Sequence, residues 1–343
     1  MISRVLIVGH GNIGKLHLRI ALESLPDADI RVLRHQPCDA TPEFADGCFG
    51  NLAEACAFAP QLAVIANPAP FHLDTALALA NAGSHLLIEK PLFSTASGVW
   101  PLLHQARERK LILQVGYNLR FLSSLRQFRE QLHTGRIGRV LSIRCEVGQY
   151  LPSWRPDADY RMGVSARQEL GGGVLLELSH ELDYLRWLFG EVAWVTAWLG
   201  RQSALQVDVE DTAHMTLCFV PDTSQQAPVA TLNLDFIRHD TTRQCTAIGE
   251  LGSLRWNGLT GEVEARPVGS GAWQSVSHHA HQRDDSYRAQ WEHFLKCVQT
   301  GRTPEVTGAD GLTVLDIIEA ARQSAAAQCA RVAIISTMEA ARA

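Results

Sequence analysis

Two short segments carry the residues best suited to chemistry. Lys90 follows an apolar run, and its ammonium could hydrogen-bond a reacting hydroxyl and stabilise the alkoxide that forms as hydride leaves. His180 stands between the carboxylates of Glu177 and Asp183, and a histidine held by an acid exchanges a proton near neutral pH. Lys90 could instead be an ordinary surface lysine, and His180 could belong to a helix whose polar face is simply solvated.

A glycine-rich turn with the sequence GHGNIG (residues 9–14) follows the apolar run 2–8 and opens a helix-like stretch at 15–25. In a G-x-G-x-x-G turn the first glycine makes the tight turn, the second lets the backbone approach a pyrophosphate, and the third lets helix and strand pack closely. The helix N-terminus then offers unpaired N–H groups to the phosphate. A turn that serves packing only is the alternative. The predicted dinucleotide contacts are Gly9, Gly11, Asn12, Ile13 and Gly14.

The residue at the end of the second strand distinguishes NAD from NADP. An Asp or Glu about 20 residues beyond the glycines would bind the ribose 2′-OH of NAD. Arg34 stands there, followed by His35, and no acid is present, so both residues are predicted cofactor contacts. Because a guanidinium suits a 2′-phosphate, this position favours NADP over NAD, although a solvated loop arginine is the alternative.

The surrounding pattern predicts an α/β protein of two domains. Short apolar strands alternate with helices of 10–15 residues up to about residue 120, which indicates βαβ units on a parallel sheet. Beyond it, most strands alternate apolar with polar residues, as in a sheet with one covered face. We therefore predict a Rossmann domain over 1–120 and an α+β domain with a large, mostly antiparallel open sheet over 121–343. One amphipathic helix is expected over 174–189.

Four motifs in order resemble the Gfo/Idh/MocA oxidoreductase family. They are GHGNIG, EKP (89–91), GYNLRF (116–121), and a GGG (171–173) followed by a helix with His180 and Asp183 three apart. The resemblance implies reversible hydride transfer between nicotinamide and a hydroxyl carbon of a sugar, sugar acid or cyclitol. It also implies that Lys90 is the catalytic lysine and His180 the active-site histidine, and that the open sheet makes an oligomer interface.

One position departs from the family pattern. An aspartate commonly stands four residues before the histidine, but position 176 is Leu. Glu177 stands three before it instead, and on a continuous helix it would share that face. This version of the helix resembles a branch associated with bacterial polysaccharide and nonulosonic-acid genes, which hints at an amino-sugar or nucleotide-sugar substrate.

The resemblance and the positions of polar residues suggest further contacts. The cofactor contacts implied at strand ends are Asn67, Pro68, His72 and Glu89. Polar residues after the last strand of the first domain, and aromatic and guanidinium groups in the segment 150–167, suit a sugar with an anionic group. These candidate substrate contacts are Tyr117, Asn118, Arg120, Trp154, Arg155, Tyr160 and Arg161, and a surface loop is the alternative for the last four.

Composition excludes several classes. The 343-residue chain has a formal charge of −5 and no basic cluster, so nucleic-acid and anionic-membrane binding are not expected. No apolar run could span a bilayer, and the N-terminal apolar stretch is too short for a signal peptide. The eight cysteines form no CxxC pair, so we expect mostly reduced thiols in the cytoplasm. His278, His279 and His281 lack a suitably spaced partner, so no metal is expected.

The sequence therefore predicts an NADP- or NAD-dependent oxidoreductase of CH–OH groups on a sugar, amino sugar, nucleotide sugar or cyclitol. We expect a homodimer or homotetramer formed through the C-terminal sheet. Two alternatives keep the cofactor: a lyase or glycosidase that oxidises its substrate transiently, and a nucleotide sensor without catalysis.

Overall fold

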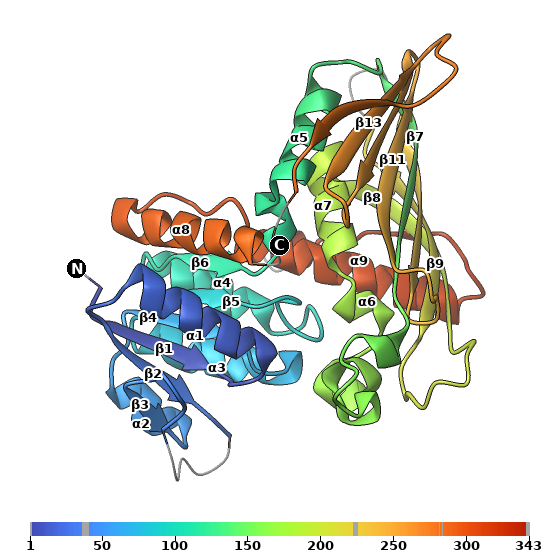
Figure 1. Ribbon diagram of the computed structural model, residues 1–343. Helices are drawn as coiled ribbons and strands as arrows, with labels where there is room; N and C mark the ends of the chain where they lie inside the picture. Colours follow the sequence, from blue (N-terminus) through green and yellow to red (C-terminus); the bar gives the residue numbers. More distant parts are fainter. Residues whose placement is uncertain (1, 36–40, 222–225, 281, 283, 341–343) are drawn as a thin grey trace. The chain divides into compact units, whose positions relative to one another are not determined.

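The computed structural model describes residues 2–35, 41–221, 226–280, 282 and 284–340, and the chain divides into two compact units (Figure 1). The first unit comprises Met1–Tyr117, Tyr287–Leu315 and Thr337–Ala343. The second comprises Asn118–Ser286 and Asp316–Ser336. The chain thus leaves the first unit close to residue 120 and later returns to it.

The first unit is built on a six-stranded parallel sheet in the order β3-β2-β1-β4-β5-β6. Its central strands are nearly continuous apolar runs because helices cover both faces of a parallel sheet. This is the Rossmann-type sheet that the alternating pattern predicted. The strands are β1 (Arg4–Val8), β2 (Asp29–Leu33), β3 (Gly47–Phe49), β4 (Leu62–Ile65), β5 (His85–Ile88) and β6 (Leu113–Val115).

Helices of the first unit include one from late in the sequence. Trp291 and Phe294 of α8 join Leu18 and Ile20 of α1 in one buried cluster with the strands. The distant segment 287–300 is therefore part of this unit's core. The helices are α1 (Asn12–Ser24), α2 (Leu52–Ala57), η1 (Ala69–Phe71), α3 (His72–Asn81), α4 (Val99–Glu108), α8 (Asp285–Thr300), α9 (Gly308–Ala326) and α10 (Thr337–Ala340), of which α8 and α9 are shared with the second unit.

The second unit holds a nine-stranded sheet in the order β14-β13-β12-β11-β7-β10-β9-β8-β15. Every neighbouring pair is antiparallel except β7 and β10, as expected for a large, mostly antiparallel sheet. The strands are β7 (Val140–Gly148), β8 (Val192–Gly200), β9 (Thr212–Phe219), β10 (Val229–Asp235), β11 (Thr242–Gly249), β12 (Gly252–Asn257), β13 (Glu262–Pro267), β14 (Gln274–His278) and β15 (Val332–Ala333).

Helices lie along one face of this sheet (Figure 1). Alternation along β9 turns Met215 and Leu217 to the covered face, where both are buried. The opposite face carries a row of paired threonines, Thr196, Thr216 and Thr231, on β8, β9 and β10. The helices are η2 (Asn118–Phe121), α5 (Ser123–His133), η3 (Leu151–Ser153), η4 (Tyr160–Met162), η5 (Val164–Ala166), η6 (Gln168–Leu170), α6 (Val174–Glu177) and α7 (His180–Phe189).

The expectation of one helix over 174–189 is wrong. α6 ends at Glu177 and α7 begins at His180, so Glu177 and His180 do not share one continuous helix. The alternative of a solvated polar face does not hold either, since Glu181 and Asp183 are at most 1% exposed. The break places these acids in the first turn of α7, where the positive end of the helix dipole favours them.

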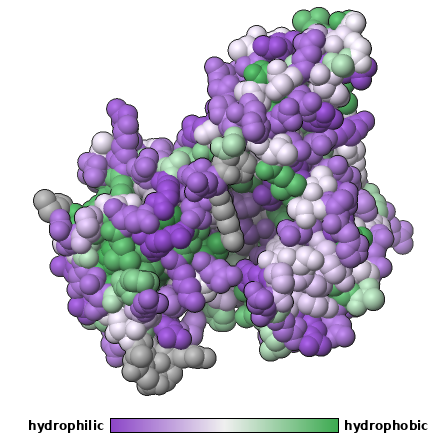
Figure 2. Space-filling model, viewed as in Figure 1, coloured by the Kyte–Doolittle hydropathy of each residue, from purple (hydrophilic) through white to green (hydrophobic). Residues whose placement is uncertain are grey.

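The view in Figure 2 shows mostly hydrophilic residues over both units, and apolar residues gather mainly at the left, over the first unit. In the described part of the chain, no helix combines the length and the apolar character that a membrane span requires.

Candidate active site

The glycine turn has the geometry that the motif requires. Gly9 has φ +89°, and a Cβ there would lie 2.8 Å from the Ala66 carbonyl oxygen. A Cβ at Gly14 would lie 2.1 Å from the Gly9 oxygen. A Cβ at Gly11 would meet nothing within 4 Å, so the turn is open at the one glycine that must admit a pyrophosphate.

The start of α1 is electropositive. Its first intrahelical bond runs from the Lys15 N–H to the Gly11 carbonyl, so the N–H groups of Asn12 and Ile13 precede the helical ladder. Burial, together with the nearby charges of Lys15 and Arg34, lowers the pKa of His10. Helix N–H groups and two cations therefore surround the turn, as an anionic ligand requires.

Arg34 follows β2 directly, and its N–H donates to the Phe49 carbonyl at 3.0 Å. The side chain is half-buried, and that of His35 is exposed, with its ring centroid 5.2 Å from that of Phe71. The strand end therefore carries a cation at the position where NAD enzymes carry an acid.

Asn67 is a buried polar side chain beside the glycine turn. It follows β4, and its backbone N lies 2.9 Å from where a Cβ of Gly9 would be. Its side chain is 9% exposed, yet neither Oδ1 nor Nδ2 has a hydrogen-bond partner within the described residues. Because buried amides are normally satisfied, this one is suited to a bound molecule.

His72 binds protein carbonyls. The ring is 1% exposed, with Nε2 2.6 Å from the Asn67 oxygen and Nδ1 3.1 Å from the Leu92 oxygen. Burial lowers the pKa of His72, although these carbonyls favour the charged form. The side chain thus ties the turn after β4, which includes Pro68, to the segment after β5.

Glu89 directly follows β5 and belongs to a buried polar network that the sequence analysis missed. Its Oε1 lies 2.7 Å from Nε2 of His17, and its Oε2 accepts the Lys90 N–H at 3.2 Å. The Trp291 indole donates to Nδ1 of His17 at 2.8 Å. The available signal was the polar His17 on the otherwise apolar buried stripe of α1. Lys90 itself is half-buried.

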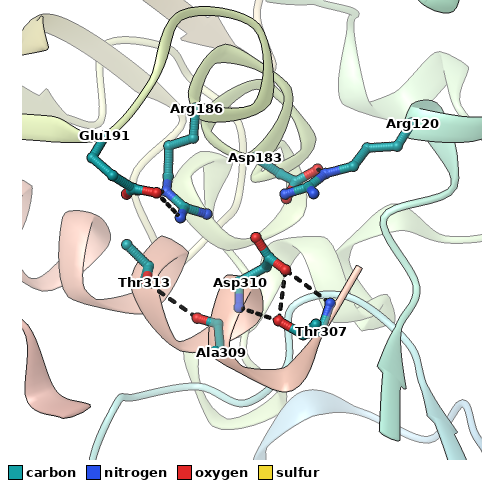
Figure 3. A network of polar contacts seen from close by, with 8 residues as sticks. All are labelled: Arg120, Asp183, Arg186, Glu191, Thr307, Ala309, Asp310 and Thr313. Carbon is teal, nitrogen blue, oxygen red and sulfur yellow. Dashed lines mark hydrogen bonds and ion pairs between the residues drawn. The ribbon is translucent and has the colours of Figure 1, made fainter. Parts of the chain in front are cut away.

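In the second unit, Arg120 and Asp183 bind each other (Figure 3). The Arg120 Nε and Nη2 donate to the two carboxylate oxygens at 2.9 and 2.6 Å, and both side chains are at most 5% exposed. A buried carboxylate requires such a partner. The two residues were predicted for separate roles, in substrate binding and in holding His180, and the structure brings them together.

Glu177 and His180 flank the break between α6 and α7. The Ser165 hydroxyl donates to Glu177 Oε2 at 2.6 Å, and His180 is 8% exposed. Beneath them, Glu181 accepts from Arg243 Nε at 2.8 Å, and the Tyr184 hydroxyl lies 3.0 Å from Cys145 Sγ. Arg243 lies 62 residues from Glu181 in the chain, and nothing in the sequence pattern indicated that the two side chains would pair.

The other candidate substrate residues differ in exposure. Tyr117 is fully buried, and the Asn118 amide donates to Ser286 Oγ at 2.7 Å. Trp154 is half-buried with its indole bound to the Gln149 carbonyl, whereas Arg155 is exposed.

Tyr160 and Arg161 lie in one exposed segment. The Tyr160 hydroxyl accepts the Gln206 N–H at 3.2 Å, and Arg161 pairs with Asp159 at 2.7 Å. Arg161 lines a surface pocket of about 440 Å³ that also holds Asp159 and Asp208. Acidic and basic groups are thus mixed there.

Within the described residues, no group of three or more His, Cys, Asp or Glu side chains could hold a metal ion. Of the three histidines considered for metal, His281 lies outside the described residues. Among the cysteines that the structure describes, Cys48 is disulfide-bonded and six carry free thiols, namely Cys56, Cys145, Cys218, Cys245, Cys297 and Cys329.

These features define a Rossmann-type unit with a glycine turn suited to a dinucleotide, and an α/β unit with a helix that carries buried acids. Residues 3–117 match the model described as "Oxidoreductase family, NAD-binding Rossmann fold", and residues 129–334 match "Oxidoreductase family, C-terminal alpha/beta domain". The chain belongs to the Gfo/Idh/MocA oxidoreductase family. It is an oxidoreductase that acts on CH–OH groups and uses a nicotinamide cofactor, as the sequence predicted.

Known proteins resemble the chain over almost its whole length. The rhizopine catabolism protein MocA of Rhizobium meliloti is 28% identical over 335 residues, covering 93% of this chain and 94% of that protein. Inositol 2-dehydrogenase 2 of Saccharopolyspora erythraea is 26% identical, covering 95% and 94%. A levoglucosan dehydrogenase in complex with NADH and levoglucosan shares the fold, with a TM-score of 0.82, 21% identity and coverage of 97% and 99%.

We expect Gly11→Ala to fold normally but to bind cofactor poorly. Gly11 has φ −73°, which alanine adopts readily, and its Cβ would extend into open space where the pyrophosphate approaches. NADH affinity, measured by fluorescence titration, should fall about 10-fold or more, equal to about 1.4 kcal/mol. Gly14→Ala is the matched control and should lower the unfolding temperature, because its Cβ meets backbone. Unchanged NADH affinity in Gly11→Ala would contradict the assignment of the turn.

His72 should make folding stability sensitive to acid. Because burial lowers its pKa in the folded state, the unfolded chain takes up a proton first as the pH falls below about 6.5. The contribution of neutral His72 to folding stability is thus fully present above about pH 6.5, and it is lost as the pH falls toward the lower pKa that His72 has in the folded state. His72→Gln should flatten the pH dependence of the unfolding temperature below about pH 6.5, and the exposed His104→Gln should not. An equally steep dependence in His72→Gln would contradict this.

Proposed function

We propose that this protein is a dehydrogenase or reductase of a sugar-like substrate: a sugar, amino sugar, nucleotide sugar or cyclitol. The observation that carries the proposal is the unpartnered, buried Asn67 amide beside the open glycine turn, which suits a nicotinamide dinucleotide. The named relatives, which act on inositol or levoglucosan, support the substrate class.

The cofactor supplies the hydride acceptor or donor when bound, and the protein supplies the acid–base groups. His180 takes the hydroxyl proton during oxidation, and Lys90 stabilises the developing oxyanion. Asp183, held by Arg120, places a fixed negative charge on the same helical turn as His180. Glu177, held by Ser165, is the acid that stands in for the aspartate absent at position 176.

In this proposal the buried Tyr117 supports the first unit and the paired Arg120 supports the second, and neither contacts the substrate directly. Trp154, Arg155, Tyr160 and Arg161 stay candidates for contact with the substrate, and a cytoplasmic location stays a prediction.

A screen of sugars, cyclitols and nucleotide sugars with both cofactors tests the activity. We expect one mole of reduced cofactor for each mole of substrate oxidised, measured by absorbance. Turnover without net reduced cofactor would instead identify a lyase or glycosidase. Tight cofactor binding without turnover of any compound would identify a sensor.

Lys90→Ala and His180→Ala should each lower kcat by about 10²–10⁴-fold. Cofactor binding, measured by fluorescence titration, should barely change, because neither side chain lies in the glycine turn. Lys110→Ala, at an exposed position of the same unit, is the control for Lys90. Near-native turnover in either variant would remove that residue from the mechanism.

The cofactor is proposed to be NADP. Arg34 adds a cation for a 2′-phosphate, and a charge-assisted pair contributes about 1.5–3 kcal/mol, which corresponds to a preference of about 10–150-fold. Arg34→Asp should reverse the preference in parallel titrations with NADH and NADPH, and Arg107→Asp, at an exposed position of the same unit, should leave it unchanged. Tighter NADH binding by the unaltered protein would overturn the NADP assignment but not the dehydrogenase proposal.

We also propose that the open sheet face joins subunits into a homodimer or homotetramer. Met215 and Leu217 lie on the opposite, covered face of the sheet and cannot contribute to this interface. The large apolar residues of the open face include Trp194 and Trp198, and Trp198 is 39% exposed. The row of Thr196, Thr216 and Thr231 lies beside these tryptophans, and its small side chains would let the open faces of two sheets pack against each other.

Thr231→Arg should shift the protein toward monomer in light scattering at micromolar concentration, because it would bury a charge within the proposed interface. Thr260→Arg, in an exposed turn outside the sheet, should not. A monomeric unaltered protein would contradict the proposed interface.

A further inference from the structure

We propose that Trp291 and His17 are positioning residues that hold Glu89, and through it the backbone of Lys90, in the arrangement used for catalysis. The inference rests on the proposed role of Lys90 and deepens it. All four residues belong to the first unit. Neither His17 nor Trp291 belongs to the motifs that identify the site in the sequence.

The indole determines which nitrogen of His17 carries the proton. An indole N–H can only donate, and Trp291 Nε1 lies 2.8 Å from His17 Nδ1. Nδ1 therefore accepts and holds no proton, so the ring proton is on Nε2. Nε2 lies 2.7 Å from Glu89 Oε1 and donates to it. Trp291 thus converts His17 into a dedicated donor toward the carboxylate.

Glu89 uses both carboxylate oxygens within this network. Oε1 accepts from His17, and Oε2 accepts the Lys90 N–H at 3.2 Å. A carboxylate that rotates away from His17 also loses the Lys90 N–H. The direction in which the chain leaves β5 at Lys90 is therefore coupled to the donor of His17.

Burial and packing leave the network little freedom. His17 and Trp291 are fully buried and Glu89 is 6% exposed. The Tyr287 ring packs edge-on against His17 with a centroid distance of 5.9 Å. A Cβ at Gly116 would lie 2.9 Å from the Glu89 Cδ, so the backbone itself closes one side of the carboxylate. Water has little access to replace a lost donor, and an unpaired buried carboxylate is costly.

A matched pair of substitutions separates positioning from mere filling of space. His17→Gln keeps an N–H donor that can reach Glu89, whereas His17→Leu keeps volume but removes the donor. We expect kcat of His17→Leu to fall on the order of 10²-fold, as for other small misplacements of a catalytic group. His17→Gln should recover most of the activity, Trp291→Phe should be intermediate, and NADH affinity should stay close to that of the unaltered protein in all three.

A spectroscopic readout tests the network without turnover. The ¹⁵N NMR signals of His17 in the full-length protein, assigned by comparison with His17→Gln, should show a protonated Nε2 and an unprotonated Nδ1. In Trp291→Phe the Nδ1 signal should move as its donor is lost. A proton on Nδ1 in the unaltered protein would overturn the proposal, even if His17→Leu fails to fold.

Equal losses of kcat in well-folded His17→Leu and His17→Gln would also overturn it, as would unchanged kcat in His17→Leu. These outcomes differ from failure of the proposed function. If Lys90→Ala kept full activity, the role of Lys90 would be withdrawn, and the tautomer measured by NMR would still decide whether Trp291 and His17 hold Glu89.

Discussion

The first unit depends on a contact between backbone segments that no side chain can enter. Gly9 packs against the end of β4, and Gly14 packs against Gly9 at distances that exclude a Cβ. This double approach brings the N-terminus of α1 over the carboxyl ends of the strands, where ligands of open parallel sheets bind. Gly11 and Asn67 owe their places to it, because Gly11 lies within the turn and the backbone of Asn67 packs against Gly9.

The second unit is organised by buried charges on α7. Asp183 is neutralised by Arg120 and Glu181 by Arg243, so two acids sit almost fully buried in the first turn of one helix. Removing one member of such a pair leaves an unpaired charge, which is far more costly than the pair is stabilising. The pairs therefore fix the position of His180 at the start of the helix more strictly than packing alone would.

The sequence predicted the features that are local and periodic. The glycine turn, the parallel strands and most of the alternating strands depend on neighbouring residues, and the spacing of four motifs was enough to identify the family. The sequence pattern did not indicate four strands of the structure: the short β3 and β15, and β12 and β14, which lie on either side of β13. The return of α8 to the first unit also gave no signal, because Trp291 and Phe294 form an apolar helix face that any core could accept.

The candidate site was less predictable than the fold, since polar partners in it are far apart in the chain. Arg120 and Asp183 were both selected as functional, but nothing in their spacing of 63 residues indicated that they bind each other. The break between Glu177 and His180 was missed because the apolar period continues through it. His17 was overlooked because a histidine on a buried helix face is recognised only once Glu89 and Trp291 are seen beside it.

The central claim is direct hydride transfer between a carbinol carbon and the nicotinamide. It is tested most directly with a substrate from the screen that carries deuterium on the carbon to be oxidised. The reduced cofactor, isolated and examined by mass spectrometry, should contain one deuterium per molecule. A reduced cofactor without deuterium, or deuterium released to water during turnover, would contradict the account.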